Sequence, residues 1–166
     1  MIATLMVKLK SESIPMRYYV NIDIENWSSR ISKGILKFNR KGVVLMNINN
    51  RVVYNPALIA HWGLYLITRY VETRNSALIK MIRNIVEWFQ KSKEETEYGG
   101  YVWRYNFSLP SYHLKQGWIS GLAQGLIISF FIRASIILGD SRLLDMARKT
   151  FLPMIKPCLL YTSDAA

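Results

Sequence analysis

Metal-binding side chains are scarce in this sequence, with one cysteine and two histidines in 166 residues. A single cysteine excludes a disulfide framework and a thiolate metal cluster. The two histidines, His61 and His113, are too few for a histidine-based zinc site without carboxylate ligands. No phosphate loop, dinucleotide fingerprint, zincin motif or nucleophile elbow is present. We therefore expect neither a metal nor a cofactor.

Long apolar runs are also missing. The most apolar stretch, residues 125–132, ends at Arg133, whereas a membrane span requires about 20 apolar residues. The first ten residues lack the apolar core and cleavage site of a signal peptide. We therefore expect no transmembrane segment. The missing leader favours the cytoplasm if Met1 is the true start, and the compartment is otherwise open.

Acidic residues are half as frequent as basic ones, 11 against 22, which gives a net charge of +11. Such a balance favours a polyanionic partner, whether nucleic acid, an acidic membrane face or an acidic polysaccharide. A solvated basic surface without any partner explains the charge equally. The hydrophobic content of 51% excludes general disorder.

The last nine residues, CLLYTSDAA, resemble the translation of a sequencing-library adapter behind a truncated gene. We expect residues 158–166 to be such an artefact, and we exclude them from the reasoning on fold and function. On this interpretation the real protein continues beyond Pro157, and the only cysteine is not natural.

The N-terminal third has a strand-like pattern. Apolar and polar residues alternate over 19–24, as in a half-buried strand. Further strands are predicted at 35–38, 43–48 and 51–54, with Gly42 in the first turn and Asn49-Asn50 in the second. We expect residues 1–54 to form a short β-rich segment.

The rest of the chain has helical patterns. Four helices are predicted, at about 56–70, 76–90, 119–138 and 142–152. Asn55-Pro56 is a start signal, with a capping residue before proline at the first helical position. Ser76 is a plausible cap for the second helix. Gly139-Asp140-Ser141 is expected to end the third helix and cap the fourth.

The two helix pairs resemble each other at an offset of about sixty residues. Residues 60–64 resemble 123–126, and Asn75-Ser76-Ala-Leu resembles Asp140-Ser141-Arg-Leu. Repeated helical hairpins stack and bury each other's apolar faces. The long connection between the hairpins favours an (α/α) toroid over an array with short loops. We therefore predict a mainly α fold, a partial (α/α) toroid or barrel over 55–157, preceded by a small antiparallel β region.

The connection between the hairpins is rich in aromatic residues, interleaved with Arg104, His113 and Lys115. The aromatic residues are Tyr98, Tyr101, Trp103, Tyr105, Phe107, Tyr112 and Trp118. Aromatic faces stack on sugar rings, and arginine pairs with carboxylate or sulfate. The alternative is a loop folded over the helix ends with its aromatics in the core, and both interpretations stay open here.

Two further polar residues lie in predicted helices. His61, beside Trp62, is more simply a structural hydrogen-bonding group than a catalyst. Arg133 lies in an apolar helix and should face a cleft or pair with an acid, because a buried unpaired guanidinium is costly.

Several blocks together resemble the C-terminal catalytic domain of D-glucuronyl C5-epimerases, the heparan sulfate and heparosan epimerases. The most specific block is Gly117-Trp-Ile-Ser-Gly-Leu-Ala-Gln-Gly125. The others are Lys41-Gly-Val43, Tyr54-Asn-Pro-Ala-Leu-Ile-Ala60 with Gly63-Leu64, Trp88, Gly99-Gly-Tyr101, Ile128-Ser129, Arg133-Ala134 and Gly139-Asp140. The resemblance covers about residues 40–154 and implies an (α/α) barrel.

The resemblance also implies an activity. It implies inversion of C5 in D-glucuronyl residues of an acidic polysaccharide, by proton abstraction and reprotonation from the opposite face. Such a reaction needs cationic or hydrogen-bonding groups near the carboxylate and an acid or base on each face. The family's catalytic tyrosines, glutamate and arginine lie beyond Met154, so we expect the chain itself to be inactive. A homodimer is left open.

The resemblance implies substrate contacts at positions that match the family's binding stretches. These are Tyr54, Asn55, His61, Arg104, Tyr105 and Asn106, to which we add Trp118 and Gln124 from the most specific block. His61 departs from the glutamine that is usual in the family, and Tyr101 replaces a usual tryptophan.

Two alternatives remain. Another (α/α)-toroid enzyme, a polysaccharide lyase or glycoside hydrolase, fits the same pattern, and a hydrolase would need two carboxylates around the glycosidic bond. Glu94, Glu95 and Glu97 are more simply a solvated loop. The other alternative is a non-catalytic basic module that binds polyanions. Nucleic acid is not the favoured partner, because the basic residues are spread along the chain and no nucleic-acid motif is present.

Overall fold

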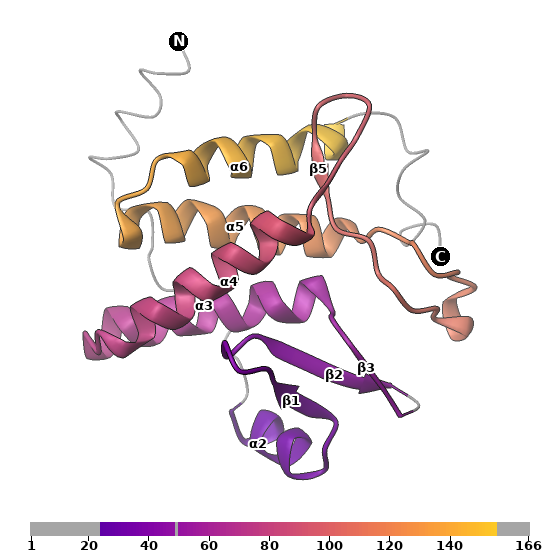
Figure 1. The fold of residues 1–166 in the computed structure, drawn as a ribbon, viewed down its shortest axis with the longest axis horizontal. Helices are drawn as coiled ribbons and strands as arrows, with labels where there is room; N and C mark the ends of the chain where they lie inside the picture. The colour runs from indigo at the N-terminus through magenta and orange to yellow at the C-terminus, as the bar shows by residue number, and fades with distance from the viewer. Residues whose placement is uncertain (1–23, 49, 156–166) are drawn as a thin grey trace.

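The computed structural model describes residues 24–48 and 50–155 (Figure 1). This part of the chain contains five α-helices, a three-stranded antiparallel sheet and a separate two-stranded hairpin. The predicted mainly helical fold with a small antiparallel sheet is therefore confirmed. Most of the expected first strand and the expected artefact at 158–166 lie outside the described residues.

The described chain begins with a helix that the sequence pattern did not predict. Helix α2 (Ile24–Ser32) starts at the last residue of the alternating 19–24 tract, so the strand prediction is wrong at that residue. The buried Trp27 stacks on Trp62 with 5.3 Å between ring centroids. One aromatic side chain thus attaches the helix to the rest of the fold. The alternation of apolar and polar residues over 19–24 carries no information on this contact, because both tryptophans lie outside that tract.

The three-stranded sheet agrees with the predicted hairpins. Its strands β1 (Leu36–Phe38), β2 (Val44–Ile48) and β3 (Arg51–Val53) lie in sequence order. In the first turn the Asn39 Oδ1 accepts hydrogen bonds from the backbone N–H groups of Lys41 and Val43, at 2.9 and 3.0 Å. Gly42 has a φ of 76°, a left-handed conformation that favours glycine.

The tip of this hairpin is attached to the helices. The side chain of Asn84 donates to the backbone oxygen of Lys41 at 2.8 Å, and Trp62 Nε1–H donates to the Gly42 oxygen at 3.2 Å. Phe38 also packs against Trp62, with 5.1 Å between ring centroids. The sheet is therefore held against the helices by directional contacts.

Four helices form the main body of the described chain. They are α3 (Pro56–Thr73), α4 (Ala77–Ser92), α5 (Gly121–Leu138) and α6 (Arg142–Phe151), and a 3₁₀ turn, η2 (Leu152–Ile155), follows α6. The predicted cap at Asn55 is confirmed, because its side chain accepts from the Leu58 N–H at 3.1 Å. Ser120 caps α5 in the same way through the Ala123 N–H.

The turns inside the two helical pairs have the same construction. The residue after α3, Arg74, and the residue after α5, Gly139, both have left-handed backbones. The next residue, Asn75 or Asp140, accepts a hydrogen bond through its side-chain Oδ1 from the backbone N–H two positions on. The predicted side-chain cap at Ser76 is wrong, because Ser76 has a helical backbone and no capping hydrogen bond. The predicted stop and cap at Gly139-Asp140-Ser141 is confirmed, with Asp140 rather than Ser141 as the capping side chain. The Asx side chain before each serine has taken that acceptor role.

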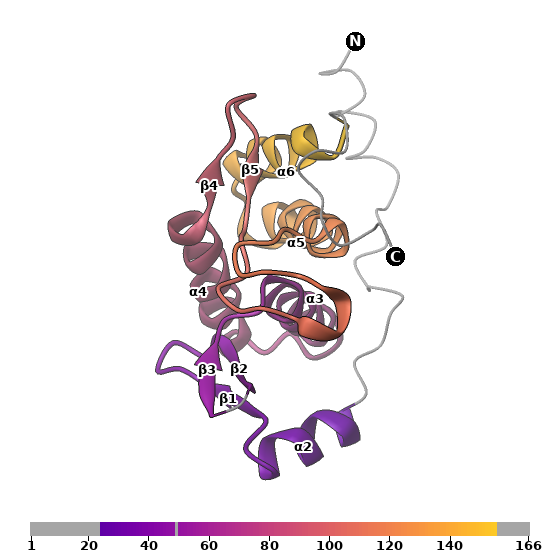
Figure 2. The ribbon, with the colours of Figure 1, turned by 90° about the vertical axis from the view of Figure 1, so that its right-hand side faces the viewer.

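The helices form two stacked hairpins. In Figure 1, α3 and α5 run in the same direction, and α4 and α6 return in the opposite one. Figure 2 shows α6, α5 and α3 one above another, with α4 along one side and the sheet next to α3. The core between them is aromatic, with Phe89, Phe130 and Phe131 fully buried. This arrangement is compatible with part of a toroid, and closure of a ring stays a prediction.

Helix α5 bears on the expectation that the chain has no transmembrane segment. By length and composition alone, its residues Gly121–Leu138 could cross a membrane, because the apolar run continues on both sides of Arg133. In the described structure 44% of this window is buried, and the helix packs against α3 and α6. A single helix of this length and composition is weak evidence for a span, so α5 is not a clear membrane span.

The connection between the hairpins starts with β4 (Glu94–Glu95) and β5 (Tyr101–Val102) and continues through a 3₁₀ turn, η1 (Pro110–Tyr112). Most of its aromatic side chains are core residues. Tyr101, Trp103, Tyr105, Phe107 and Trp118 are buried, whereas Tyr98 and Tyr112 are exposed. For the five buried residues, the alternative of a loop folded over the helix ends is therefore the correct one.

Candidate functional site

A small pocket lies where the sheet, the start of α3, the end of α4 and the segment after β5 meet. Its volume is about 170 Å³. It is lined by Tyr54, Pro56, Trp88, Ser92, Trp103, Arg104 and Asn106. Pockets for drug-sized ligands measure roughly 300–1,000 Å³. This pocket therefore suits one ring or one charged group of a larger ligand.

Aromatic rings form one side of the pocket. Tyr54 and Trp88 lie with ring centroids 5.3 Å apart, and Trp88 meets Phe89 edge-on at 5.0 Å. Behind them, Trp103 Nε1–H donates to the Phe89 backbone oxygen at 3.0 Å. Trp88 is only half-buried. The wall is thus held by the core while part of an indole remains accessible.

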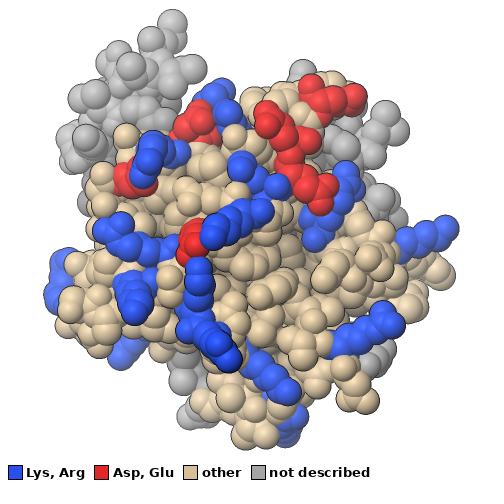
Figure 3. Space-filling view, in the orientation of Figure 1, with Lys and Arg blue, Asp and Glu red and all other residues tan. Residues whose placement is uncertain are grey.

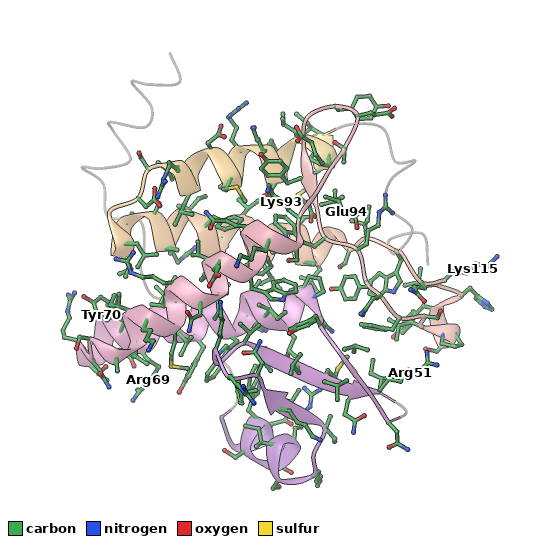
Figure 4. All side chains as sticks on the ribbon, viewed as in Figure 1. Arg51, Arg69, Tyr70, Lys93, Glu94 and Lys115 are labelled. Atoms are coloured by element: carbon green, nitrogen blue, oxygen red, sulfur yellow. The ribbon has the colours of Figure 1, made fainter. Side chains whose placement is uncertain are left out.

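Arg104 supplies the positive charge at the pocket. Its Nε donates to Glu94 Oε2 at 2.9 Å, and its Nη1 donates to the Gly117 backbone oxygen at 2.8 Å. Figure 4 shows Glu94 just beyond the end of α4. Among the described residues, no hydrogen bond is formed by Nη2. The guanidinium is therefore positioned by two contacts and keeps donor capacity for an acidic ligand.

Polar groups complete the lining. Asn106 is exposed, and the Ser92 hydroxyl donates to the Trp88 backbone oxygen at 2.7 Å. The Tyr54 hydroxyl accepts a long hydrogen bond of 3.4 Å from Asn39 Nδ2. Of the predicted site residues, Tyr54, Arg104 and Asn106 are thus brought together around one pocket.

Three other predicted residues, Asn55, Tyr105 and Trp118, hold the backbone around the pocket in place. Asn55 caps α3. The buried Tyr105 stacks on Trp118 with 3.6 Å between ring centroids, and its hydroxyl accepts from the Ala57 N–H at 3.3 Å. Burial raises the pKa of Tyr105 to about 12, so its phenol is neutral at physiological pH. Trp118 Nε1–H donates to the Phe107 backbone oxygen at 2.9 Å. These contacts position the loop, and a substrate contact by any of the three stays a prediction.

The last two predicted residues lie away from the pocket lining. Gln124 is fully buried in α5, where its Nε2 donates to the backbone oxygens of Tyr101 and Thr150 at 2.8 and 3.1 Å. It thereby joins β5 and α6. His61 is half-buried on α3, and burial lowers its pKa, so its imidazole is neutral at physiological pH.

Four residues of the lining were not predicted as site residues: Pro56, Trp88, Ser92 and Trp103. Trp88 appeared only as part of the family resemblance, and Ser92 carried no signal at all. Both lie in the last turns of α4, at 88 and 92, so they share one helix face. In the sequence, Trp88 stands beside Phe89 of the predicted apolar face and close to the predicted end of the helix. A tryptophan in that position is the signal that could have identified this wall.

Arg133 is partly buried in α5, where its Nη1 donates to the side chain and backbone oxygen of Ser129, one turn earlier.

Within residues 24–48 and 50–155, no group of three or more histidine, cysteine, aspartate or glutamate side chains could hold a metal ion. The chemistry of the pocket is therefore described by its aromatic and arginine side chains.

An aromatic wall with an arginine at its edge is typical of sites for sugars that carry an acidic group. Comparison with known families agrees with a site for such sugars. Residues 96–159 match the family described as D-glucuronyl C5-epimerase C-terminus, which confirms the resemblance stated from the sequence. No curated protein and no solved structure matches the chain. The family match indicates part of a carbohydrate epimerase.

Proposed function

We propose that this chain is the part of a uronyl C5-epimerase that binds acidic polysaccharide, with one sugar unit in the pocket. The observation that carries the proposal is the position of Arg104 beside the Tyr54–Trp88 wall, because a uronate needs a ring surface and a cation together. The family match over residues 96–159 supports the same substrate class. The net charge of +11 favours a polyanionic ligand.

The proposed reaction inverts C5 of a D-glucuronyl residue. A base removes the C5 proton, the negative charge spreads onto the adjacent carboxylate, and an acid returns a proton to the opposite face. Cationic and hydrogen-bond donors stabilise that charge as it develops. Arg104 is the described residue best suited to this role, and Asn106 is a second donor. The resemblance implies that the acid and base groups follow Met154.

Part of a larger (α/α) barrel is the proposed setting for this pocket. The two stacked hairpins supply its support, because α3 begins at Pro56 and α4 ends at Ser92, both in the lining. Further hairpins stacked on α5 would bury its exposed Leu122 and Ile136. In this arrangement the polymer would pass over the helix ends that line the pocket, at the start of α3 and the end of α4.

The carboxylates near the pocket do not favour the hydrolase alternative. Glu94 pairs with Arg104, and the other two carboxylates are exposed, Glu95 at the end of β4 and Glu97 in the turn after it. A hydrolase or lyase would shorten the polymer, whereas an epimerase leaves its length unchanged. Product analysis with the intact parent separates these reactions.

The proposal is tested with a tetrasaccharide that alternates glucuronate and N-acetylglucosamine. Arg104→Gln should weaken its binding about tenfold or more, because a charge-assisted hydrogen bond is worth about 1.5–3 kcal/mol. Trp88→Leu should weaken binding through loss of the ring surface, and Trp88→Phe should retain most of it. Calorimetric titration measures these affinities.

Lys115→Ala is the matched control, because Lys115 lies at the far end of the connecting loop (Figure 4). Its affinity should equal that of the unchanged chain. Equal binding by Arg104→Gln and the unchanged chain, with circular dichroism showing both folded, would contradict the proposed pocket.

A further inference from the structure

A row of basic side chains lies on the exposed side of α4 and continues onto the β1–β2 turn. We define this basic ridge as Arg40, Lys41, Lys80, Arg83 and Lys91, all exposed. Lys80, Arg83 and Lys91 lie three and eight residues apart on α4, and at 1.5 Å per residue they span about 16 Å. In Figure 3 the blue groups over α4 continue toward the sheet, with a single red group among them.

Glu87 on α4 lies among these cations and holds two of them in place. Lys41 Nζ donates to Glu87 Oε2 at 2.8 Å, and Lys91 Nζ donates to Oε1 at 2.6 Å. Both lysines lower the pKa of this carboxyl to about 2, so it stays ionised. Glu87 and the five cations together carry a net charge of +4. Asp140, which pairs with Arg142, also interacts electrostatically with Arg83.

The ridge crosses two elements, yet its parts are fixed relative to each other. The Asn84 side chain donates to the Lys41 backbone oxygen, and Trp62 donates to the neighbouring Gly42 oxygen. Met81 also packs close to Gly42, because a Cβ built there would lie 3.3 Å from the Met81 Cε. A rigid array of charges binds a polyanion with a smaller loss of conformational entropy than a flexible one.

The ridge and the pocket are neighbours on the same helix. Trp88 and Ser92 line the pocket, and Glu87 and Lys91 each precede one of these residues by one position. A chain with one unit beside Trp88 would therefore have the cations of α4 along its continuation. The ridge itself contains no aromatic residue, whereas single-stranded nucleic acid binding uses aromatic side chains for base stacking.

We propose that the basic ridge is a second binding surface, which holds a linear acidic polysaccharide outside the pocket. This inference rests on the proposed function for the identity of the polymer. The ridge increases the affinity for long chains, because a polymer that occupies both surfaces binds with the avidity of two linked sites. The carboxylates of successive uronate units are the groups it contacts.

Two charge-matched double variants test the ridge. Arg83→Ala with Lys91→Ala removes one arginine and one lysine from the ridge. Arg51→Ala with Lys115→Ala removes the same charges from positions away from α4 (Figure 4). Each is titrated with the glucuronate–N-acetylglucosamine polymer and with its tetrasaccharide, at several salt concentrations.

The ridge variant should lose about tenfold or more in affinity for the polymer at low salt, with a weaker salt dependence, because fewer counterions are released. Its affinity for the tetrasaccharide should stay unchanged. The control variant should retain polymer affinity within about twofold, since separated exposed charges are screened. Glu87→Gln should bind the polymer more tightly at low salt, because release of Lys41 and Lys91 from the carboxylate adds more attraction than the looser hold on these two side chains costs.

Other outcomes have distinct meanings. An equal loss in the two double variants would overturn the ridge and indicate attraction by net charge alone. Tighter binding of duplex or single-stranded DNA than of the polymer, at equal ionic strength, would overturn the polysaccharide as the partner. Loss of polymer binding in the ridge variant, with Arg104→Gln unchanged toward the tetrasaccharide, would keep the ridge and contradict the proposed pocket.

Discussion

Tyr105 shows how a residue next to a binding site serves the fold. Its ring stacks on Trp118, and its hydroxyl accepts the Ala57 N–H in the first turn of α3. The Ser120 side chain, which caps α5, also hydrogen-bonds to this hydroxyl. One phenol thus links the starts of both helices, and its mutation would affect the pocket indirectly.

The raised pKa of Tyr105 predicts a dependence of stability on alkaline pH. The folded value is about 12, and an unfolded tyrosine ionises near pH 10. The folded state therefore favours the neutral phenol, so this contribution is complete below pH 10. It falls by up to about 2–3 kcal/mol as the pH rises from 10 to 12.

Urea unfolding at several pH values measures this loss. Tyr105→Phe should be less stable at pH 8, by about 1–2 kcal/mol from the lost hydrogen bonds, but should lose less stability between pH 10 and 12. Parallel pH curves for the two proteins would contradict the assignment.

Two glycines on neighbouring helices give opposite predictions. A Cβ on Gly63 in α3 would lie 2.6 Å from the Phe130 ring of α5, whereas a Cβ on Gly125 would meet nothing within 4 Å. Gly63→Ala should destabilise the fold, because overpacking costs about 1–3 kcal/mol and exceeds the gain in helix propensity. Gly125→Ala should stabilise it by up to about 1 kcal/mol.

Thermal unfolding of both variants compares these effects. The pair is matched in chemistry and in secondary structure, so any difference reports the helix contact. Stabilisation by Gly63→Ala would show that α3 and α5 are farther apart than described.

At the scale of elements, the two turns of the repeat differ at one residue. The left-handed position is Arg74 after α3 and Gly139 after α5, with φ of 54° and 66°. A left-handed backbone costs a non-glycine residue about 1–2 kcal/mol. Arg74→Gly should therefore stabilise the chain by up to about 1 kcal/mol, after loss of the cation–π contact with Tyr70.

The reverse change, Gly139→Ala, should destabilise by about 1 kcal/mol. Chemical denaturation of the two variants and the unchanged chain measures both shifts. Destabilisation by Arg74→Gly would mean that the contact with Tyr70 outweighs the backbone strain.

The helices and the hairpin could be predicted because their signals are local. Asn55-Pro56 marks the start of α3, and Gly42 and Gly139 lie at left-handed positions that few other residues accept. The errors have local causes too. At Asn75-Ser76 two residues compete to accept the same kind of hydrogen bond. The sequence does not indicate that the Asx side chain is the one that forms it.

At the scale of the whole molecule, the pocket could be predicted only in part. Tyr54, Arg104 and Asn106 were selected from the sequence, but their meeting with Trp88 depends on how α4 packs against α3. The core role of Tyr105 and Gln124 was equally hidden, because a buried amide and a buried phenol look polar in a sequence. Most of their partners are backbone atoms of residues that are distant in the chain or on another element.

The short bridge in the connecting loop bears on how this protein can diversify. Leu109 and Leu114 exchange two backbone hydrogen bonds of 2.9 and 3.1 Å, which close the loop tip around η1. Residues inserted beyond this closure leave both helical hairpins and the aromatic core untouched. Each doubling of such a loop costs only about 0.6 kcal/mol in closure entropy. Insertions or substitutions at the tip should therefore cost little stability, and they would change the surface at the far end of the connecting loop.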